Sequence, residues 1–186
     1  MSSWDLPLFV DIGGVQYAIR NKCDYRVVLD VIEALNDEDL DIESRIKCAL
    51  FIFYEDLSGC NDLNTAVKKM MEIVNNGEKE DDEEQSQKPR LMDWQHDFSM
   101  IAPPVSRVLG YDVRTPDRYC HFWTFIGAYM EIGECTFANI VSIRSKKRKG
   151  KKLEKHEMEF YKDNRKKIDL PLKLSSEDQE FLDSEW

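Results

Sequence analysis

The 186-residue sequence has few of the residues from which catalytic and metal sites are built. Its five cysteines and three histidines include no Cys-x-x-Cys or His-x-x-x-His pair, so we expect no metal site. No serine lies in a Gly-x-Ser-x-Gly turn, and no cysteine has neighbours that would lower its pKa. Gly13-Gly14 lacks the further glycines and the lysine of a phosphate-binding loop. We therefore expect a protein that is not an enzyme and needs no cofactor.

Long apolar runs are missing as well. No segment reaches about 18 consecutive apolar residues, the length that a membrane-spanning helix needs. No apolar stretch follows a basic start at the N-terminus, so a signal peptide is not expected. An odd number of scattered cysteines is typical of reduced thiols in a cytosolic protein. These absences predict a cytoplasmic protein that does not cross a membrane.

One dipeptide superficially resembles a motif of metal-dependent phosphohydrolases of the HD type. His96-Asp97 follows Asp93 by about one helical turn, but these enzymes also need a histidine further upstream. His96 is the first histidine of the chain, so we favour a solvated helix face. A hydrolase of this kind would require bound metal, which elemental analysis would detect.

Charge is distributed unevenly along the chain, which has a formal net charge of -10. Residues 140–167 hold twelve Lys and Arg against four acidic residues, so the remainder is strongly acidic. Such a distribution favours self-association or an oriented partner. The densest part of the run predicts a partner-binding surface, with these candidates: Arg144, Lys146, Lys147, Arg148, Lys149, Lys151 and Lys152.

Two kinds of partner fit this basic run. Dense Lys and Arg suit phosphate contacts, but no aromatic residues alternate with the charges, and the acidic remainder would repel a polyanion. We therefore favour an acidic protein partner or a solvated surface, and keep a nucleic-acid-binding regulator as the alternative. Such a regulator would bind less tightly as salt rises, and reversing the charges of Lys147, Lys149 and Lys151 would abolish binding.

The apolar periodicity predicts a mainly helical (α+β) protein with one short N-terminal β-hairpin. Residues 8–20 alternate around Gly13-Gly14, a pair that supplies the positive φ of a tight turn. Helical spacing then recurs along the chain, and we expect Pro103-Pro104 to break one of the helices. The expected helices cover residues 24–36, 42–57, 61–76, 94–109 with its break, 122–132, 136–147 and 153–168.

Composition divides the chain into two bundle-like lobes. Residues 1–76 contain the hairpin and three helices, and residues 91–170 contain the remaining helices, with the aromatic segment from His121 in their core. The acidic residues 77–90 between the lobes predict a linker, or an arm that lies on the basic run. Residues 171–186 predict a flexible acidic tail.

Several short motifs identify a family. They include Asp24-Tyr-Arg26 near the start, Asp93-Trp94 and Asp112-Val-Arg114 in the middle, and His121-Phe-Trp-Thr-Phe125 later on. With these motifs the chain resembles the bacteriophage gene-product-fifteen family of tailed phages and prophages of Gram-positive bacteria, from about Phe9 to Leu170. The motif residues that we expect to be structural are Asp24, Tyr25, Arg26, Trp94, Arg114, His121, Trp123 and Phe125.

The resemblance implies a role in tail morphogenesis and carries over no catalytic residues. Genes of this family lie where tail assembly chaperones are encoded, between the tail tube and the tape measure. Such a chaperone coats the tape measure protein in the cytoplasm of the bacterial host, helps recruit tail tube subunits and is absent from the finished virion. A tape measure has apolar stripes, which a helical protein with exposed aromatics is suited to cover.

Overall fold

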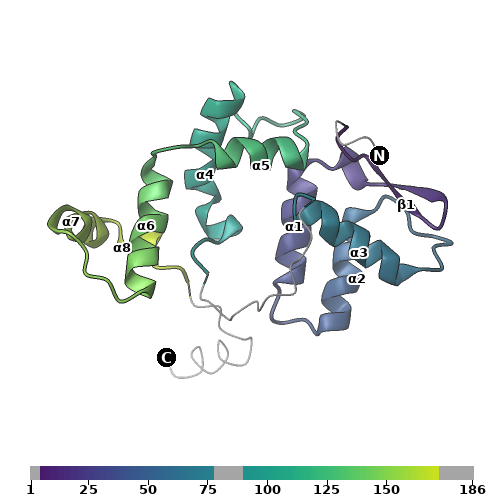
Figure 1. Cartoon of the computed structure of the whole chain (residues 1–186), viewed down its shortest axis with the longest axis horizontal. Coiled ribbons are helices and arrows are strands. Elements are labelled where there is room, and N and C mark those ends of the chain that lie inside the picture. The colour runs from purple at the N-terminus through teal and green to yellow at the C-terminus, as the bar shows by residue number, and fades with distance from the viewer. Residues whose placement is uncertain (1–4, 78–89, 172–186) are drawn as a thin grey trace. The chain divides into compact units, whose positions relative to one another are not determined.

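A computed structural model describes residues 5–77 and 90–171, which form two compact units (Figure 1). Of the described residues, unit 1 holds 5–77 and 119–126, and unit 2 holds 90–118 and 127–171. The elements are mainly helices, with one antiparallel pair of strands near the N-terminus. This confirms the predicted fold class. The predicted linker and tail fall almost wholly on residues 78–89 and 172–186, which lie outside the described residues.

The hairpin of unit 1 consists of β1 (Phe9–Ile12) and β2 (Val15–Ala18). Ile12 pairs with Val15 across a two-residue turn, whose glycines Gly13 and Gly14 have φ values of 62° and 85°. Positive φ at both positions matches the twist of a tight hairpin, so the predicted turn is confirmed. A 3₁₀ turn, η1 (Arg20–Lys22), follows β2.

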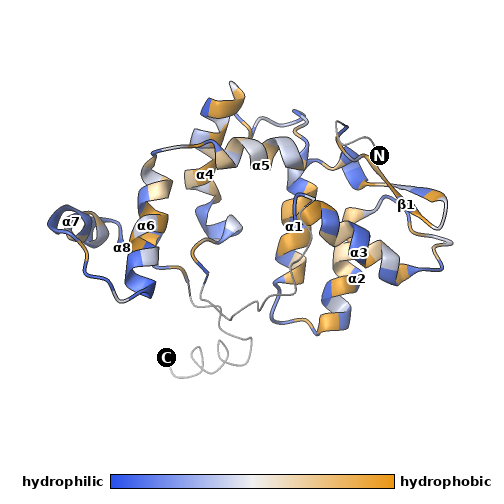
Figure 2. Cartoon of the chain, viewed as in Figure 1, coloured by the Kyte–Doolittle hydropathy of each residue, from blue (hydrophilic) through white to orange (hydrophobic). Residues whose placement is uncertain are grey.

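Three helices complete the main part of unit 1, and an aspartate caps the N-terminus of each. Asp24, Asp41 and Asp62 accept a hydrogen bond from a backbone N–H in the following first turn, which would otherwise lack a partner. Figure 2 shows that α1 is mostly hydrophobic, as its burial in the unit requires. The helices are α1 (Tyr25–Leu35), α2 (Ile42–Phe53) and α3 (Leu63–Val74).

The second helix ends four residues before the predicted Leu57. Tyr54 turns to an extended conformation, with φ -93° and ψ 145°, and forms a β-bridge with Ile19. Its buried hydroxyl donates to the Ala66 carbonyl at 2.9 Å. The helix therefore ends where Tyr54 gains partners on both the hairpin side and α3.

Unit 2 is built from helices around an aliphatic centre. Ile140, Ile143 and Ile168 are at most 2% exposed, and Phe160 and Tyr161 pack against them. The helix α5 belongs to unit 1 as far as Ile126 and to unit 2 from Gly127. The helices are α4 (Trp94–Leu109), α5 (Phe122–Met130), α6 (Thr136–Arg148), α7 (Lys155–Asp163) and α8 (Arg165–Ile168).

The predicted break at Pro103-Pro104 is wrong, because α4 continues through both prolines. Each proline lacks an N–H, so two carbonyls one turn earlier lose their helical donor. Pro104 is nevertheless buried beside Ala102 and Val105, which are both 0% exposed. Burial of this face offsets the lost hydrogen bonds.

The predicted single helix over residues 153–168 is also wrong, since it divides at Asn164 into α7 and α8. The Asn164 backbone has φ -119° and ψ 22°, outside the helical range. Its side-chain amide donates to the Phe160 carbonyl at 3.1 Å, a local bond that competes with helix continuation.

The aromatic segment that starts at His121 is divided between the units. The sequence placed it in the second lobe, whereas residues 119–126 pack with unit 1. Backbone hydrogen bonds explain the difference, because the Tyr25 N–H donates to the Cys120 carbonyl and the Phe122 N–H donates to the Cys23 carbonyl, both at 2.9 Å.

No helix in the described part of the chain is long and apolar enough to cross a bilayer.

Candidate functional site

Six of the eight motif residues come together in unit 1. Asp24 caps α1 by accepting from the Arg26 N–H at 3.0 Å, and its other oxygen accepts from the Cys120 N–H, also at 3.0 Å. These two residues are 96 positions apart in the sequence. One buried carboxylate therefore fixes both the start of α1 and the segment that leads into α5.

His121 fastens the same region to the segment before the hairpin. Its Nδ1 accepts from the Trp123 N–H at 3.0 Å, so its Nε2 carries the hydrogen and donates to the Pro7 carbonyl at 3.1 Å. The side chain is buried, and this burial lowers the pKa of His121 from its ordinary value. Both ring nitrogens are thus engaged in packing this unit.

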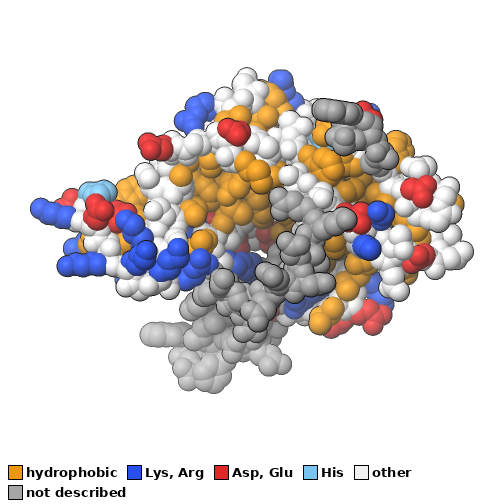
Figure 3. Space-filling model, in the orientation of Figure 1, with side chains coloured by type: hydrophobic (Ala, Val, Ile, Leu, Met, Phe, Trp, Pro, Cys, Tyr) orange, Lys and Arg blue, Asp and Glu red, His pale blue; other side chains and the backbone are white. Residues whose placement is uncertain are grey.

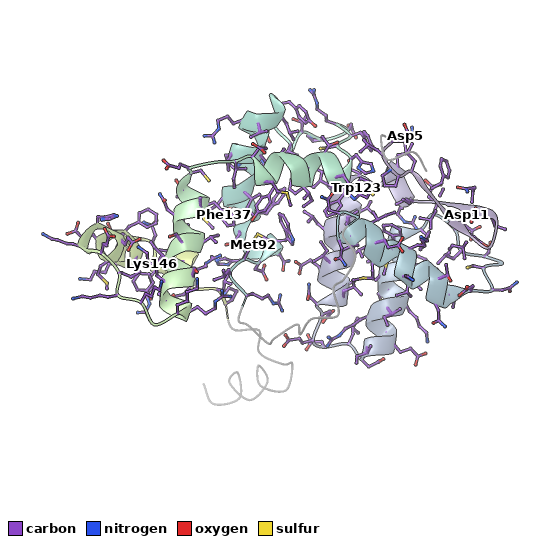
Figure 4. All side chains as sticks on the ribbon, in the orientation of Figure 1. Asp5, Asp11, Met92, Trp123, Phe137 and Lys146 are labelled. Atoms are coloured by element: carbon purple, nitrogen blue, oxygen red, sulfur yellow. The ribbon has the colours of Figure 1, made fainter. Side chains whose placement is uncertain are left out.

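Aromatic rings complete the motif cluster. Tyr25 and Phe125 stack with centroids 4.4 Å apart, and the Arg26 guanidinium lies 4.8 Å from the Tyr25 ring centroid. Trp123, labelled in Figure 4, donates its indole N–H to the Ile73 carbonyl at 3.0 Å. The cluster joins residues that are distant in sequence, and the hydrogen bonds of Asp24, His121 and Trp123 given above lie within unit 1.

The other two motif residues lie in unit 2. Trp94 is the first residue of α4. Arg114 binds Asp112 through two side-chain hydrogen bonds of 3.0 and 2.8 Å, and these bonds lower the pKa of Asp112 to about 2. This pair is exposed and steadies the loop after α4.

Arg144 is not part of the exposed basic surface that the sequence predicted. It is 7% exposed, and its guanidinium makes a bidentate ion pair with Asp97 at 2.6 and 2.8 Å. Its remaining hydrogen bonds go to the carbonyls of Leu91, Lys167 and Ile168. Arg144 therefore joins α6 to α4 and α8 inside unit 2.

The same ion pair corrects the interpretation of His96-Asp97. Asp97 is 0% exposed, so the predicted solvated face is wrong for this residue. Asp93 caps α4 by accepting from the His96 N–H at 2.8 Å. No group of three His, Cys, Asp or Glu side chains in residues 5–77 and 90–171 is placed to hold a metal ion.

Two further basic candidates have acidic partners within unit 2. Lys146 pairs with Glu157 at 2.6 Å, and Lys147 pairs with Asp169 and the Tyr161 hydroxyl. Figure 4 labels Lys146 in the part of unit 2 near α7. These pairs hold α6 against α7 and against the end of α8, so part of the basic run is used internally.

The remaining candidates, Arg148, Lys149, Lys151 and Lys152, are exposed around a turn at Gly150, whose φ is 63°. We call Lys149, Lys151 and Lys152 the basic ridge. Figure 3 shows Lys and Arg side chains gathered over α6 and α7. Lysines in the last turn of α6 also complement the negative end of the helix dipole, so some of this charge stabilises the helix.

A groove of about 240 Å³ opens between α6 and α7. Ile143 and Phe160 give it apolar walls, while His156 and Glu157 contribute polar groups. Its volume is below the usual range for small-molecule sites, which is roughly 300–1,000 Å³. The groove therefore suits an inserted side chain. The residues lining it are Asn139, Ser142, Ile143, His156, Glu157 and Phe160.

An apolar surface lies elsewhere in unit 2, where Figure 3 shows hydrophobic side chains gathered over α4 and α5. The Tyr129 ring is 5.2 Å from Trp94 and 6.2 Å from Phe137, measured between centroids. The Tyr129 hydroxyl donates to the Met92 sulfur at 3.0 Å. We call these four residues the aromatic surface; Figure 4 labels Met92 and Phe137.

Sequence reasoning singled out only Trp94 of the aromatic surface. Met92 precedes α4, while Tyr129 and Phe137 lie on α5 and α6, so no spacing pattern links them. Met92, Trp94 and Tyr129 are half-buried, and Phe137 is 2% exposed. The sequence offered one signal for this surface. When each helix is assigned an apolar stripe that faces its own core, some large apolar residues are left outside these stripes.

The molecule is thus a mainly helical protein with an aromatic surface, a basic ridge and a side-chain-sized groove in unit 2. A family model described as Bacteriophage Gp15 protein matches residues 4–170. The chain belongs to this phage protein family, which confirms the resemblance seen in its motifs. No curated protein and no solved structure match it.

Proposed function

We propose that this phage protein is a non-catalytic tail assembly chaperone. In this role it binds the tape measure protein in the cytoplasm of the bacterial host and helps recruit tail tube subunits. It leaves before the virion is complete. Membership of the phage family supports the setting, and the aromatic surface of unit 2 is the observation that carries the proposed activity.

The aromatic surface has the chemistry that a helical apolar client requires. The half-buried rings of Trp94 and Tyr129 supply contact area with few rotatable bonds, the buried Phe137 ring supports them, and the Met92 thioether adapts to irregular side chains. An amphipathic helix binds such a surface through apolar residues spaced three and four positions apart. A tape measure offers many such stripes, and shielding them prevents aggregation.

Co-expression with the cognate tape measure tests the proposal. The wild-type chain should raise the soluble fraction of the tape measure, and Met92→Glu should abolish the effect by adding a charge to the aromatic surface. Gln95→Glu is the matched control, because it adds the same charge at an exposed position on the first turn of α4. Circular dichroism should show that both variants remain folded.

Two results would contradict the proposal. One is a tape measure that precipitates equally with and without the wild-type chain. The other is a loss of solubility with Gln95→Glu that equals the loss with Met92→Glu, which would exclude the aromatic surface as the contact.

A further inference from the structure

A loop of unit 1, from Asp37 to Glu43, is complementary in charge to the basic ridge of unit 2 and carries an apolar side chain that suits the groove. We call it the acidic loop. Five of the seven residues from Asp37 to Glu43 are acidic, and the sixth position, Ile42, is 74% exposed. This loop therefore presents an aliphatic side chain surrounded by negative charge. An isoleucine this exposed buries little of its side chain in its own unit.

The acidic loop is held in a defined conformation. The Asp37 carboxylate accepts from the Asp39 N–H at 3.0 Å, and the Arg45 guanidinium donates to the Leu40 carbonyl at 2.7 Å. Asp41 caps α2 by accepting from the Ser44 N–H and hydroxyl, at 3.0 and 2.7 Å. Binding this loop therefore costs little conformational entropy.

The receiving side in unit 2 combines the same two chemistries with the opposite charge. The lysines of the basic ridge lie in the loop that leads into α7, and α7 forms one wall of the groove. Ile143 and Phe160 supply apolar contact for an inserted aliphatic side chain. Exposed lysines alone would fit any polyanion, but a groove beside them selects a partner that also brings an apolar group.

We propose that the acidic loop of one copy docks on the basic ridge of a second copy, with Ile42 entering the groove between α6 and α7. Because each copy has one loop and one ridge, the contact is head-to-tail and can repeat along a series of chains. The proposal concerns only surfaces of this chain and holds whether or not a tape measure is the client.

Nucleic acid is the competing partner for the ridge, and two observations disfavour it. A phosphate backbone brings no aliphatic side chain for the groove. Described residues of unit 1 hold fourteen acidic against seven basic residues, so this unit would repel a polyanion. The second copy satisfies both the charge and the groove.

Charge reversal with mass measurement tests the contact. Sedimentation velocity on the full chain should show concentration-dependent association at about 50 mM salt that weakens at about 500 mM, since salt screens exposed charges. The ridge variant is Lys149→Glu, Lys151→Glu and Lys152→Glu. The loop variant is Glu38→Lys, Asp39→Lys and Glu43→Lys, which keeps the Asp37 and Asp41 hydrogen bonds. Each should weaken association at least roughly tenfold.

Combining both variants in one chain gives the sharpest result. This chain has the same formal net charge as the wild type but carries both surfaces with exchanged sign, so it should regain association. Ile42→Ser should weaken association without changing its salt dependence. Lys162→Glu with Lys166→Glu is the control, because it reverses exposed charge elsewhere on α7 and α8 and should leave association unchanged.

Several outcomes would overturn the proposal. A measured mass of one chain at all concentrations in low salt would exclude association with a second copy. The same conclusion would hold if the variants changed the sedimentation rate of a single chain, and so its shape, without changing its mass. Failure of the combined variant to associate would exclude this pair of surfaces. Binding of duplex DNA that is lost in the ridge variant, with no self-association, would assign the ridge to nucleic acid.

Discussion

Unit 1 and unit 2 each bury a polar centre, but they stabilise it differently. In unit 1 the Asp24 carboxylate and the neutral His121 ring bind mainly backbone groups, beside the stacked rings of Tyr25 and Phe125. In unit 2 the centre is an ion pair of Arg144 and Asp97. The comparison indicates that unit 2 depends on two charges remaining together, whereas unit 1 depends on one ring remaining uncharged.

The surfaces of the two units differ as well. Described residues of unit 1 contain seven basic and fourteen acidic residues, whereas those of unit 2 contain sixteen basic and eleven acidic residues. Unit 1 exposes large apolar side chains such as Phe51, which is 78% exposed and whose ring centroid lies 5.6 Å from the Arg20 guanidinium. In unit 2 the half-buried rings of Trp94 and Tyr129 lie 5.2 Å apart in the aromatic surface. The units are therefore suited to different contacts.

The largest expected effect comes from breaking the ion pair of unit 2. Arg144→Met leaves the Asp97 carboxylate buried without its partner, so the free energy of unfolding should fall by about 3–5 kcal/mol. Urea denaturation measures this change. Lys162→Met, an exposed substitution of the same kind in the same unit, should change it by less than about 0.5 kcal/mol.

A second substitution distinguishes the effect of the unpaired Asp97 charge from the effect of changing the side-chain volume at position 144. Adding Asp97→Leu to Arg144→Met removes the stranded carboxylate, so much of the lost stability should return. A cost below about 1 kcal/mol for Arg144→Met alone would contradict the view that unit 2 is organised around the ion pair.

The next effect concerns the uncharged ring in unit 1. Because burial lowers the pKa of His121 in the folded protein, the unfolded chain binds more protons below the ordinary value of 6.5. The stability that the neutral His121 ring contributes is therefore fully present at a pH above 6.5. It is lost as the pH falls through the pKa of His121 in the folded protein. One proton gives a limiting slope of about 1.4 kcal/mol per pH unit.

Unfolding measured from about pH 7.5 to about pH 5 should reveal this contribution. His121→Gln should be less stable at neutral pH and should lose the slope. His156→Gln is the control, since the His156 side chain is 76% exposed, and its slope should match that of the wild type. An unchanged slope in His121→Gln would show that another group controls the pH dependence.

The smallest effect compares two hydroxyls in unit 1. Tyr54→Phe removes a donor from the buried Ala66 carbonyl and should cost about 1 kcal/mol. Tyr119→Phe removes a donor from the Lys22 carbonyl at an exposed position, where water can replace it, and should cost less. Thermal denaturation of both variants gives the comparison, and equal costs would contradict it.

The sequence predicted most helices because the signals are local. Asp24 and Asp62 at the helix starts and apolar residues at helical spacing are readable without tertiary contacts. The break at Pro103-Pro104 was predicted wrongly because burial of Pro104 in unit 2 outweighs its local preference. Tyr54 likewise leaves its helix for a β-bridge that only the folded hairpin provides.

The candidate site was less predictable, because its decisive contacts join distant residues. Arg144 looked like one more exposed cation, since Asp97 lies 47 positions away and nothing local links them. The Asp24–Cys120 bond is equally invisible in the sequence, so residues 119–126 were grouped with the wrong helices. Charge density showed where the basic residues are concentrated, but not that Arg144, Lys146 and Lys147 are used in ion pairs within unit 2.

Hydrogen–deuterium exchange on the chain alone and with its cognate tape measure tests the central claim most directly. Binding should slow exchange around Met92 and Trp94 and from Tyr129 to Phe137, and should leave exchange in the β1–β2 hairpin of unit 1 unchanged. Protection confined to unit 1, or no protection anywhere in a chain that keeps the tape measure soluble, would contradict it.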